Sequence, residues 1–213
     1  MGGNVPGFAD PDSGIPPRVI DPGTNALTDN QQPGVIGLDA RTGGGAARAP
    51  PPAMGDQIVA FAQARRGHSV GDGQCFALAD QALKSASAKS AADFGTVDHD
   101  ADYVWGTATS VVDAKPGDII QFRDYRYDRE ITTDLGGGGS DTRTDFQERP
   151  HHTAIVASVD GGGAITVLEQ NAPEGSATHR VQLFFLDRDD KSGNKTTKIT
   201  IQGTFTIYRP QHR

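Results

Sequence analysis

A lone cysteine behind a glycine-rich stretch is the first candidate for chemistry in this sequence. Cys75 is the one cysteine of 213 residues, and it follows Gly71 and Gly73. It begins a run to Ser85 with small or apolar residues at helical spacing. The pattern predicts Cys75 in the first turn of a helix, where unpaired N–H groups and the helix dipole stabilise a thiolate. A small buried residue is the alternative interpretation.

Three polar residues in the second half of the sequence have side chains suited to base chemistry. Two β-prone runs flank an Asp-Gly turn at residues 160–161 and predict a hairpin. With a connecting loop of two or four residues, His152 faces Asn171, and Glu169 lies on the same face of the hairpin. A three-residue loop would break this pairing. Taken alone, each of these residues is best interpreted as a solvated strand end. Together with Cys75 they form a candidate catalytic group.

Hydrophobic patterning predicts the elements that would position these residues. A first helix is expected from Asp56, as its cap, to Arg66, and Gly67 ends it. A Pro-Gly turn at 115–118 leads into the first of several strands. The predicted strands cover residues 119–122, 151–159, 164–171, 180–186 and 198–209, with an acidic loop at 187–194. This order predicts an α+β domain with the N-terminal helices packed on one side of an antiparallel β-sheet.

The stretch from Arg123 to His151 is predicted to be a long loop. It contains Gly136–Gly139 and alternating charges, and it has no apolar period. Long loops in compact domains are uncommon and often functional, so we interpret it as a lid or a substrate-contacting insertion. A variable surface segment is the alternative interpretation.

Residues 1–54 have the composition of a disordered leader. The segment is rich in proline and glycine, and Phe8 is its one aromatic residue. Such a stretch cannot bury enough apolar surface to offset its ordering entropy. Ala49–Pro52 would act as a stiff spacer before a folded domain at residues 55–213.

The charge balance limits the expected partners. With 27 acidic and 20 basic residues the net charge is −7, which argues against nucleic acid and against an anionic membrane surface. The sequence has no run of about 18 apolar residues, and its start lacks signal-peptide regions. We therefore expect a monomer without membrane insertion, and the localisation stays open. Export to a periplasm or cell wall would need another route or earlier processing.

Metal and phosphate sites have weak support. Aspartates at alternate positions begin like a calcium loop: Asp98, Asp100 and Asp102. Position six of that loop is Tyr103 instead of glycine, and position twelve is Thr109 instead of glutamate, which favours a solvated acidic turn. The adjacent His151 and His152 would point to opposite faces of a strand, and Gly136–Gly139 lacks the lysine of a phosphate loop. We expect no metal and no cofactor.

Four short motifs follow one another along the chain at characteristic spacing. They are Gly73-Gln74-Cys75, Pro116-Gly117-Asp118, His152-Thr153-Ala154-Ile155-Val156 and Val167-Leu168-Glu169-Gln170-Asn171. Together, over residues 55–209, they resemble the CHAP family, the cysteine- and histidine-dependent amidohydrolases and peptidases of the papain-like superfamily. The resemblance implies a papain-like fold. It also implies hydrolysis of amide bonds in bacterial cell-wall peptidoglycan. The chain departs from the pattern in its insertion before His152 and in His151, where members commonly carry glycine.

Carried onto these positions, the resemblance assigns catalytic roles. Cys75 is the implied nucleophile, and His152 is the base that takes its proton and later donates one to the leaving amine. Glu169 would orient the imidazole, with Asn171 assisting or positioning substrate. Gln74 and the backbone N–H of Cys75 would stabilise the oxyanion. The hairpin puts Asn171 opposite His152 and Glu169 diagonal to it, so the sequence leaves open which one contacts the ring.

The sequence therefore predicts a thiol-dependent amidase or endopeptidase that acts on peptidoglycan or a peptide. One alternative with the same fold is a secreted toxin or effector that cleaves or deamidates a protein. Another is a non-catalytic binding module that keeps the groove without turnover. Digestion of cell wall would separate the first two, and reaction of Cys75 with a thiol reagent would separate both from the third.

Overall fold

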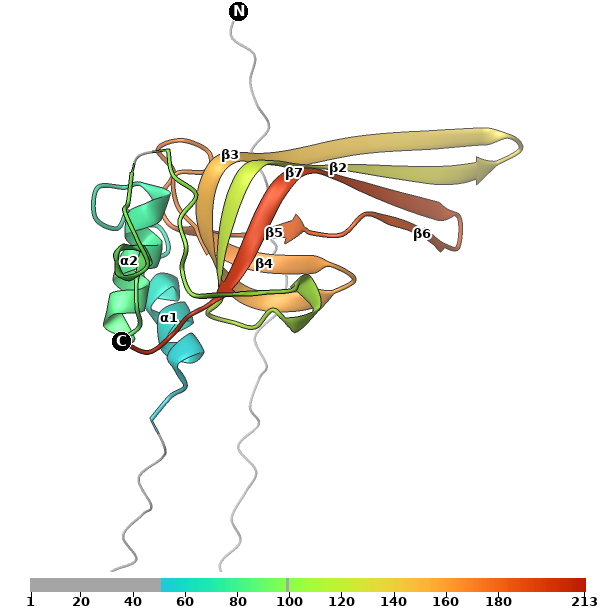
Figure 1. The fold of residues 1–213 in the computed structure, drawn as a ribbon. Helices are drawn as coiled ribbons and strands as arrows, with labels where there is room; N and C mark the ends of the chain where they lie inside the picture. Colours follow the sequence, from blue (N-terminus) through green and yellow to red (C-terminus); the bar gives the residue numbers. More distant parts are fainter. Residues whose placement is uncertain (1–50, 99) are drawn as a thin grey trace, which may run out of the picture. The chain divides into compact units, whose positions relative to one another are not determined.

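The computed structural model describes residues 51–98 and 100–213, which form two α-helices and a seven-stranded sheet (Figure 1). The elements outside the sheet are α1 (Met54–Gln63), α2 (Cys75–Ser85) and two 3-10 turns at Ala91–Asp93 and Val111–Asp113. Within this described part, neither α-helix is long and apolar enough to cross a membrane. Residues 1–50 of the predicted leader lie outside it.

All neighbouring strands of the sheet run antiparallel. The strands are β1 (Thr107–Thr109), β2 (Ile119–Gly136), β3 (Gly139–Gly161), β4 (Ala164–Glu169), β5 (His179–Phe184), β6 (Arg188–Ser192) and β7 (Lys195–Arg209). Their order across the sheet is β1-β7-β2-β3-β4-β5, and β6 also pairs with β7. The last strand of the chain therefore lies between the first two.

Both α-helices pack on the same face of the sheet, as Figure 1 shows. Their apolar stripes place these buried side chains toward the strands: Ile58, Ala62, Leu78 and Leu83. Ile119, Ile155 and Leu168 belong to the same core, one from each of β2, β3 and β4. Adjacent residues of those strands pack in a second core, because successive strand residues point to opposite faces. The central strands are thus buried on both sides.

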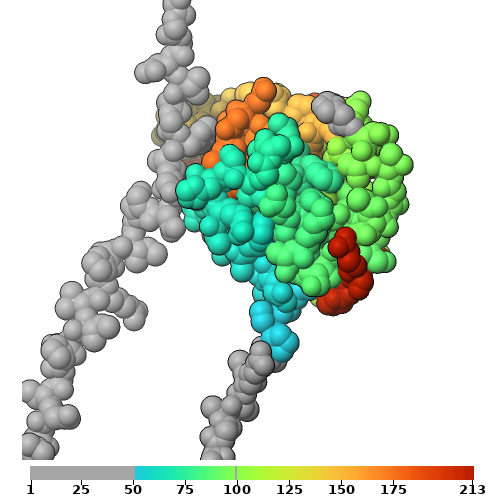
Figure 2. All heavy atoms as spheres, turned by 90° about the vertical axis from the view of Figure 1, so that its left-hand side faces the viewer, coloured from blue at the N-terminus to red at the C-terminus, as the bar shows by residue number. Residues whose placement is uncertain are grey.

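The C-terminal residues return to the helical side of the domain. The Lys89 N–H donates to the Gln211 carbonyl at 2.9 Å, and the Arg213 N–H donates to the Ser87 carbonyl at 3.1 Å. Figure 2 shows the last residues lying against this face. The end of the chain therefore fastens the segment that follows α2.

The predicted α+β class is wrong, because strands dominate the described residues and the helices are small. The segment from Arg123 to His151 was expected to be a loop, but it forms the outer parts of β2 and β3. These strands pair from Arg123 opposite His151 to Gly136 opposite Gly139. β7 pairs with β2 as far as Thr133 opposite Lys195. We call this extension, residues 126–149 with residues 195–202, the arm. Polar residues occupy both of its faces, so no apolar alternation marked it as strands.

The glycine run inside the expected loop forms the turn of the arm. Gly137 and Gly138 have φ angles of +63° and +87°, and two consecutive positive φ angles are what a tight type I′ hairpin turn requires. The prediction of an acidic loop at 187–194 was also wrong, because β6 occupies most of this segment and pairs with β7. The segment expected to be a lid is thus a β2–β3 hairpin with β7 beside it, and its role as a lid or in contacting substrate stays a prediction.

The elements around the cysteine were predicted more closely. The run from Cys75 to Ser85 is a helix with the expected bounds, whereas the N-cap of α1 is Ala53 and Asp56 lies in its first turn. The β3–β4 hairpin has a two-residue turn between Gly161 and Ala164, followed by two register shifts. After these shifts Ile155 faces Leu168, which is the register that the sequence predicted for the site.

Candidate active site

A glycine loop and the start of α2 place Cys75. It is the first residue of the helix, and Gln74 is the N-cap. Gly71 and Gly73 have φ angles of +61° and +85°, and a Cβ on Gly71 would lie 2.8 Å from the Cβ of Ala77. Gly71 therefore cannot be replaced without strain or displacement. The loop delivers Cys75 to the helix N-terminus, where the dipole favours a thiolate.

A buried glutamine fastens this loop to the sheet. Gln170 directly follows β4, and its side chain is fully buried. Its Oε1 accepts from the Val70 N–H at 2.8 Å, and its Nε2 donates to the carbonyls of Val70 and Gln74 at 2.9 and 2.7 Å. Thr178 Oγ1 donates to the same Oε1 at 3.2 Å. The position of Cys75 relative to β4 therefore depends on Gln170.

His152 and Glu169 meet between β3 and β4. Their side chains are 5% and 0% exposed, and His152 Nε2 lies 3.0 Å from Glu169 Oε2. An ionised carboxylate can only accept hydrogen bonds, so Nε2 carries the proton in this contact. The other ring nitrogen, Nδ1, is left to exchange a proton with the Cys75 thiol.

Glu169 is surrounded by basic groups. Arg149 donates from Nε to Oε2 at 2.9 Å and from Nη2 to Oε1, and His179 Nε2 lies 3.4 Å from Oε1. Burial raises the pKa of Glu169, but hydrogen bonds from His152 and His179 and the charge of Arg149 outweigh it and hold the pKa well below its ordinary value. Glu169 is therefore a buried carboxylate that stays charged at neutral pH.

The electrostatics favour a thiolate–imidazolium pair. Burial raises the pKa of Cys75, yet hydrogen bonds and the charge of His152 bring this pKa below its ordinary value. Burial likewise lowers the pKa of His152, and hydrogen bonds to Cys75 and Glu169 bring that pKa above its ordinary value. The two shifts describe one proton moving from sulfur to nitrogen. The sulfur therefore ionises at a lower pH than a free thiol.

Asn171 contacts Gln74 rather than the histidine ring. Its Oδ1 accepts from the Gly175 N–H at 2.7 Å, so its Nδ2 is the group that donates to Gln74 Oε1 at 2.9 Å. With its oxygen engaged, Gln74 keeps its amide Nε2 as a donor. Of the two residues that the sequence left open, Glu169 is the one that contacts His152.

Aromatic residues form one wall beside the cysteine. The rings of Phe76, Tyr103 and Trp105 pack with centroids 5.0 to 5.8 Å apart. Burial and the nearby charge of Cys75 raise the pKa of Tyr103, so its hydroxyl belongs to the surroundings of the sulfur. The ring of His151 lies 5.7 Å from that of Tyr103 and extends this wall.

The structure thus joins Cys75, His152 and Glu169 in one connected group and places Asn171 and Gln74 beside it. Their catalytic roles stay predictions. Within residues 51–98 and 100–213, no group of three or more histidine, cysteine, aspartate or glutamate side chains could hold a metal ion.

Three residues of this site were missed in the sequence: Arg149, Gln170 and His179. One signal was available, because a buried glutamate that orients a histidine needs a cation to offset its charge. Arg149 lay in the segment interpreted as a loop, and nothing local linked it to Glu169. Gln170 was part of a quoted motif, but its role depends on contacts about 100 residues away along the chain.

Comparison with known families agrees with this geometry. A family model described as the AIM3/BBC1 cysteine proteinase-fold domain matches residues 52–213, well over half of the chain. No curated protein and no solved structure matches the chain. The match supports the expected papain-like, cysteine proteinase fold, but it does not support the CHAP family specifically. The chain belongs to the family of AIM3/BBC1 cysteine proteinase-fold domains.

Proposed function

We propose that this domain is a thiol-dependent hydrolase that cleaves amide bonds in peptides. The observation that carries the proposal is the connected group of Cys75, His152 and Glu169, with the thiol pKa lowered and the imidazole pKa raised. Perturbed titration of coupled groups at a helix N-terminus is typical of catalytic sites. Membership of a cysteine proteinase-fold family gives independent support.

In the first half of the reaction the Cys75 thiolate attacks the carbonyl carbon of the amide, forming a C–S bond. The negative charge moves to the carbonyl oxygen, where the Cys75 N–H and the Gln74 amide would stabilise it. His152 donates its Nδ1 proton to the leaving nitrogen as the C–N bond breaks. The products are a free amine and a thioester on Cys75.

In the second half His152 Nδ1 takes a proton from water, and the oxygen attacks the thioester carbonyl. The C–S bond then breaks, releasing the carboxylic acid and restoring the thiolate and the imidazolium. Glu169 fixes the tautomer throughout, because its hydrogen bond keeps the second proton on Nε2.

The proposal is tested by the pH dependence of Cys75 alkylation with iodoacetamide, followed by mass spectrometry. We expect rapid labelling below pH 7 in the native protein and a shift to about pH 8.5, the value of a free thiol, or above it in His152→Ala, because burial alone raises the thiol pKa. His68→Ala, which removes an exposed histidine, is the matched control. Native labelling that begins only near pH 8.5, or no labelling, would contradict the hydrolase and favour the binding module.

The substrate class needs a separate experiment. The peptidoglycan prediction derives from the CHAP resemblance, and the matched family carries only the cysteine proteinase fold. We would incubate the native protein and Cys75→Ala with purified peptidoglycan and, separately, with a peptide library, and detect new termini by mass spectrometry. Products that require Cys75 in one substrate only would identify the class.

A further inference from the structure

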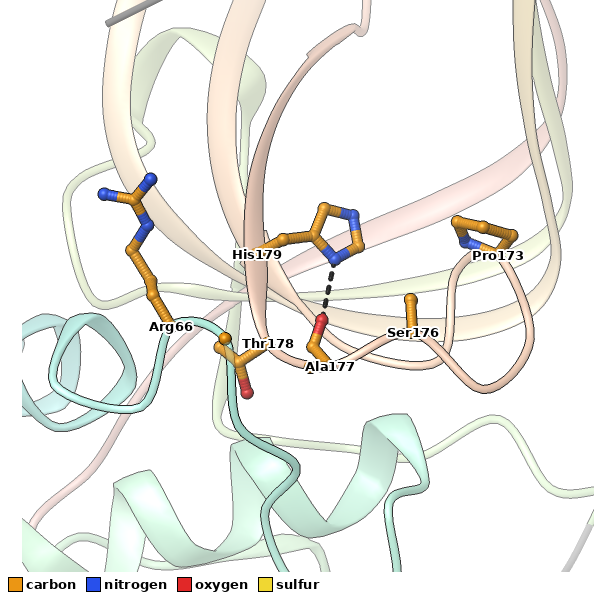
Figure 3. A pocket seen from close by; sticks show the side chains of 7 residues that line it. Arg66, Pro173, Ser176, Ala177, Thr178 and His179 are labelled. Atoms are coloured by element: carbon orange, nitrogen blue, oxygen red, sulfur yellow. Dashed lines mark hydrogen bonds between the residues drawn. The ribbon is translucent and has the colours of Figure 1, made fainter. Parts of the chain in front are cut away.

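A cavity of about 570 Å³ lies between the segment after α1 and the loop before β5 (Figure 3). It is lined by Arg66 and Gly67, which follow α1, by Pro173 and by residues 176–179. This volume is in the range of small-molecule and side-chain pockets in proteins. One lining residue, His179, is also a partner of the catalytic-site carboxylate Glu169. The cavity therefore adjoins the proposed active site.

Backbone hydrogen bonds fix the two walls of the cavity against each other. The Gly67 N–H donates to the Thr178 carbonyl at 2.8 Å, and the Thr178 N–H donates to the His68 carbonyl at 3.1 Å. The Ala172 N–H donates to Ser176 Oγ at 3.0 Å and shapes the loop that carries Pro173. The pocket is thus formed before any ligand arrives, which lowers the entropic cost of binding.

The loop that forms one wall is attached to the site at both ends. At its start Asn171 donates to Gln74, the neighbour of Cys75, and at its end His179 contacts Glu169. The wall of the cavity is therefore connected to Gln74 through Asn171 and to Glu169 through His179.

His179 contributes a positive charge to the cavity. Its Nδ1 lies 2.9 Å from the Ala177 carbonyl and its Nε2 lies 3.4 Å from Glu169 Oε1. Both partners are acceptors, so only the imidazolium, with a proton on each nitrogen, satisfies both. The hydrogen bond to Glu169 raises the pKa of His179 in agreement with this geometry. Figure 3 shows the ring between Arg66 and Pro173.

Arg66 contributes a second positive charge. Its side chain is exposed, and among residues 51–98 and 100–213 its guanidinium takes part in no hydrogen bond or ion pair. Within the same described part, no acidic side chain lines the cavity, and the nearby Glu174 lies outside the lining. Glu169 offsets the charge of His179, so Arg66 is the cation of this lining that lacks an acidic partner among the described residues, and it favours an anionic ligand.

We propose that this cavity binds a carboxylate of the peptide substrate through Arg66. Arginine pairs well with carboxylates because its planar donors match the two oxygens. Pro173 and Ala177 add apolar surface that suits the methylene groups of a glutamate-like chain. A peptide offers this chemistry from an acidic side chain or from its C-terminus. The inference rests on the proposed function in one respect, which is that the ligand is the peptide substrate of the hydrolase.

Binding can be measured without turnover in the full-length Cys75→Ala protein. We would titrate acetyl-Ala-Ala-Glu-Ala-Ala-amide and its Gln analogue, and acetyl-pentaalanine with a free or an amidated C-terminus, and follow protein NMR shifts. We expect the amide signals of Gly67 and Thr178 to respond, with one carboxylate peptide binding about fivefold more tightly than its neutral partner. The peptide that shows the preference identifies the source of the carboxylate.

Variants of the same protein locate the preference. Arg66→Gln should abolish it, and Arg66→Lys should retain part of it. Arg180→Gln is the matched control, because it removes the same charge one residue away from His179. The Arg180 side chain is exposed and lies 3.3 Å from Ser158 Oγ. Equal affinities for both members of each peptide pair, or shifts elsewhere in the protein, would overturn the inference.

The two proposals fail independently. A carboxylate preference in a protein whose native Cys75 is unreactive would overturn the hydrolase and leave the pocket standing. A reactive Cys75 with no carboxylate preference would overturn the pocket alone.

Discussion

Two arginine–carboxylate pairs with similar chemistry occupy very different surroundings in this domain. Arg149 and Glu169 lie at the site, with side chains 5% and 0% exposed, and the arginine uses separate nitrogens for the two oxygens. Arg129 and Asp145 lie on the arm, with side chains 33% and 30% exposed, and both nitrogens approach Oδ2. Burial and fork geometry therefore distinguish the pairs, since the residue types are alike.

This difference indicates where the stability of the fold depends on polar contacts. An exposed pair exchanges hydrogen bonds with water at little cost, so losing it changes stability by about 0–1 kcal/mol. Removing one partner of a buried pair leaves an uncompensated charge and costs about 3–5 kcal/mol. We therefore expect the site end of the sheet to tolerate the loss of a contact poorly, and the same buried pairing holds Glu169 against His152.

The largest effect is expected from Arg149→Met. The methionine keeps much of the side-chain volume but leaves Glu169 without its full positive charge, so the free energy of unfolding should fall by about 3–5 kcal/mol. Urea denaturation measures this value. Arg129→Met is the matched control on the arm, and it should cost less than about 1 kcal/mol. Equal losses in the two variants would contradict the comparison.

Glu169→Gln should mainly alter the chemistry of Cys75. Without the carboxylate, burial lowers the pKa of His152, and the thiolate loses the cation that stabilises it. We expect the alkylation rate near pH 6 to fall by about tenfold for each unit by which the thiol pKa rises. Asn171→Gly is the control, because Asn171 contacts Gln74 and not the ring. A similar shift in both variants would exclude Glu169 as the orienting residue.

Gln170→Leu tests the attachment of the glycine loop. Leucine fits the volume but leaves the Val70 N–H without its partner. The carbonyls of Val70 and Gln74 each keep a backbone N–H donor. One buried unsatisfied donor costs about 1–3 kcal/mol, and we expect a destabilisation of that size in urea. Gln202→Leu removes an exposed glutamine on β7 and should change stability little. Indistinguishable midpoints would show that Gln170 does not hold the loop.

The same contrast explains how much of the molecule the sequence could predict. Cys75 and its helix were found because glycines and helical spacing are local signals. His152 and Glu169 were found because a hairpin has a fixed register, which two bulges in β3 restored at the site end. The turn alone would have misplaced them, so the agreement depended on irregularities that no local pattern showed.

The arm and the site partners were missed for physical reasons. Strands with two exposed faces carry polar residues on both, so Arg123 to His151 had the composition of a loop while forming strands. The predicted fold class failed for the same reason. Arg149 and His179 act on Glu169 through tertiary contacts, and their residue types alone do not distinguish them from the exposed arginines and histidines elsewhere.

A smaller, pH-dependent effect is expected from His179→Gln. The hydrogen bond to Glu169 raises the pKa of His179, so the folded state favours the imidazolium. The resulting stabilisation is complete below about pH 6.5, the unfolded value, and disappears as the pH rises through the folded value. The difference in unfolding free energy between native protein and variant should therefore be largest near pH 5.5 and smallest near pH 9. A difference that grows with pH would contradict the charged state assigned to His179.

The smallest effect is expected from the arm, where a double-mutant cycle isolates the exposed pair. Combining Arg129→Met with Asp145→Asn should give a coupling energy below about 1 kcal/mol in urea denaturation at low salt. Because both side chains are about one-third exposed, about 1 M NaCl should remove most of that coupling by screening it. A coupling energy of about 3 kcal/mol that persists in salt would mean that exposure does not decide the strength of these pairs. The contrast between site and arm would then need a different physical cause.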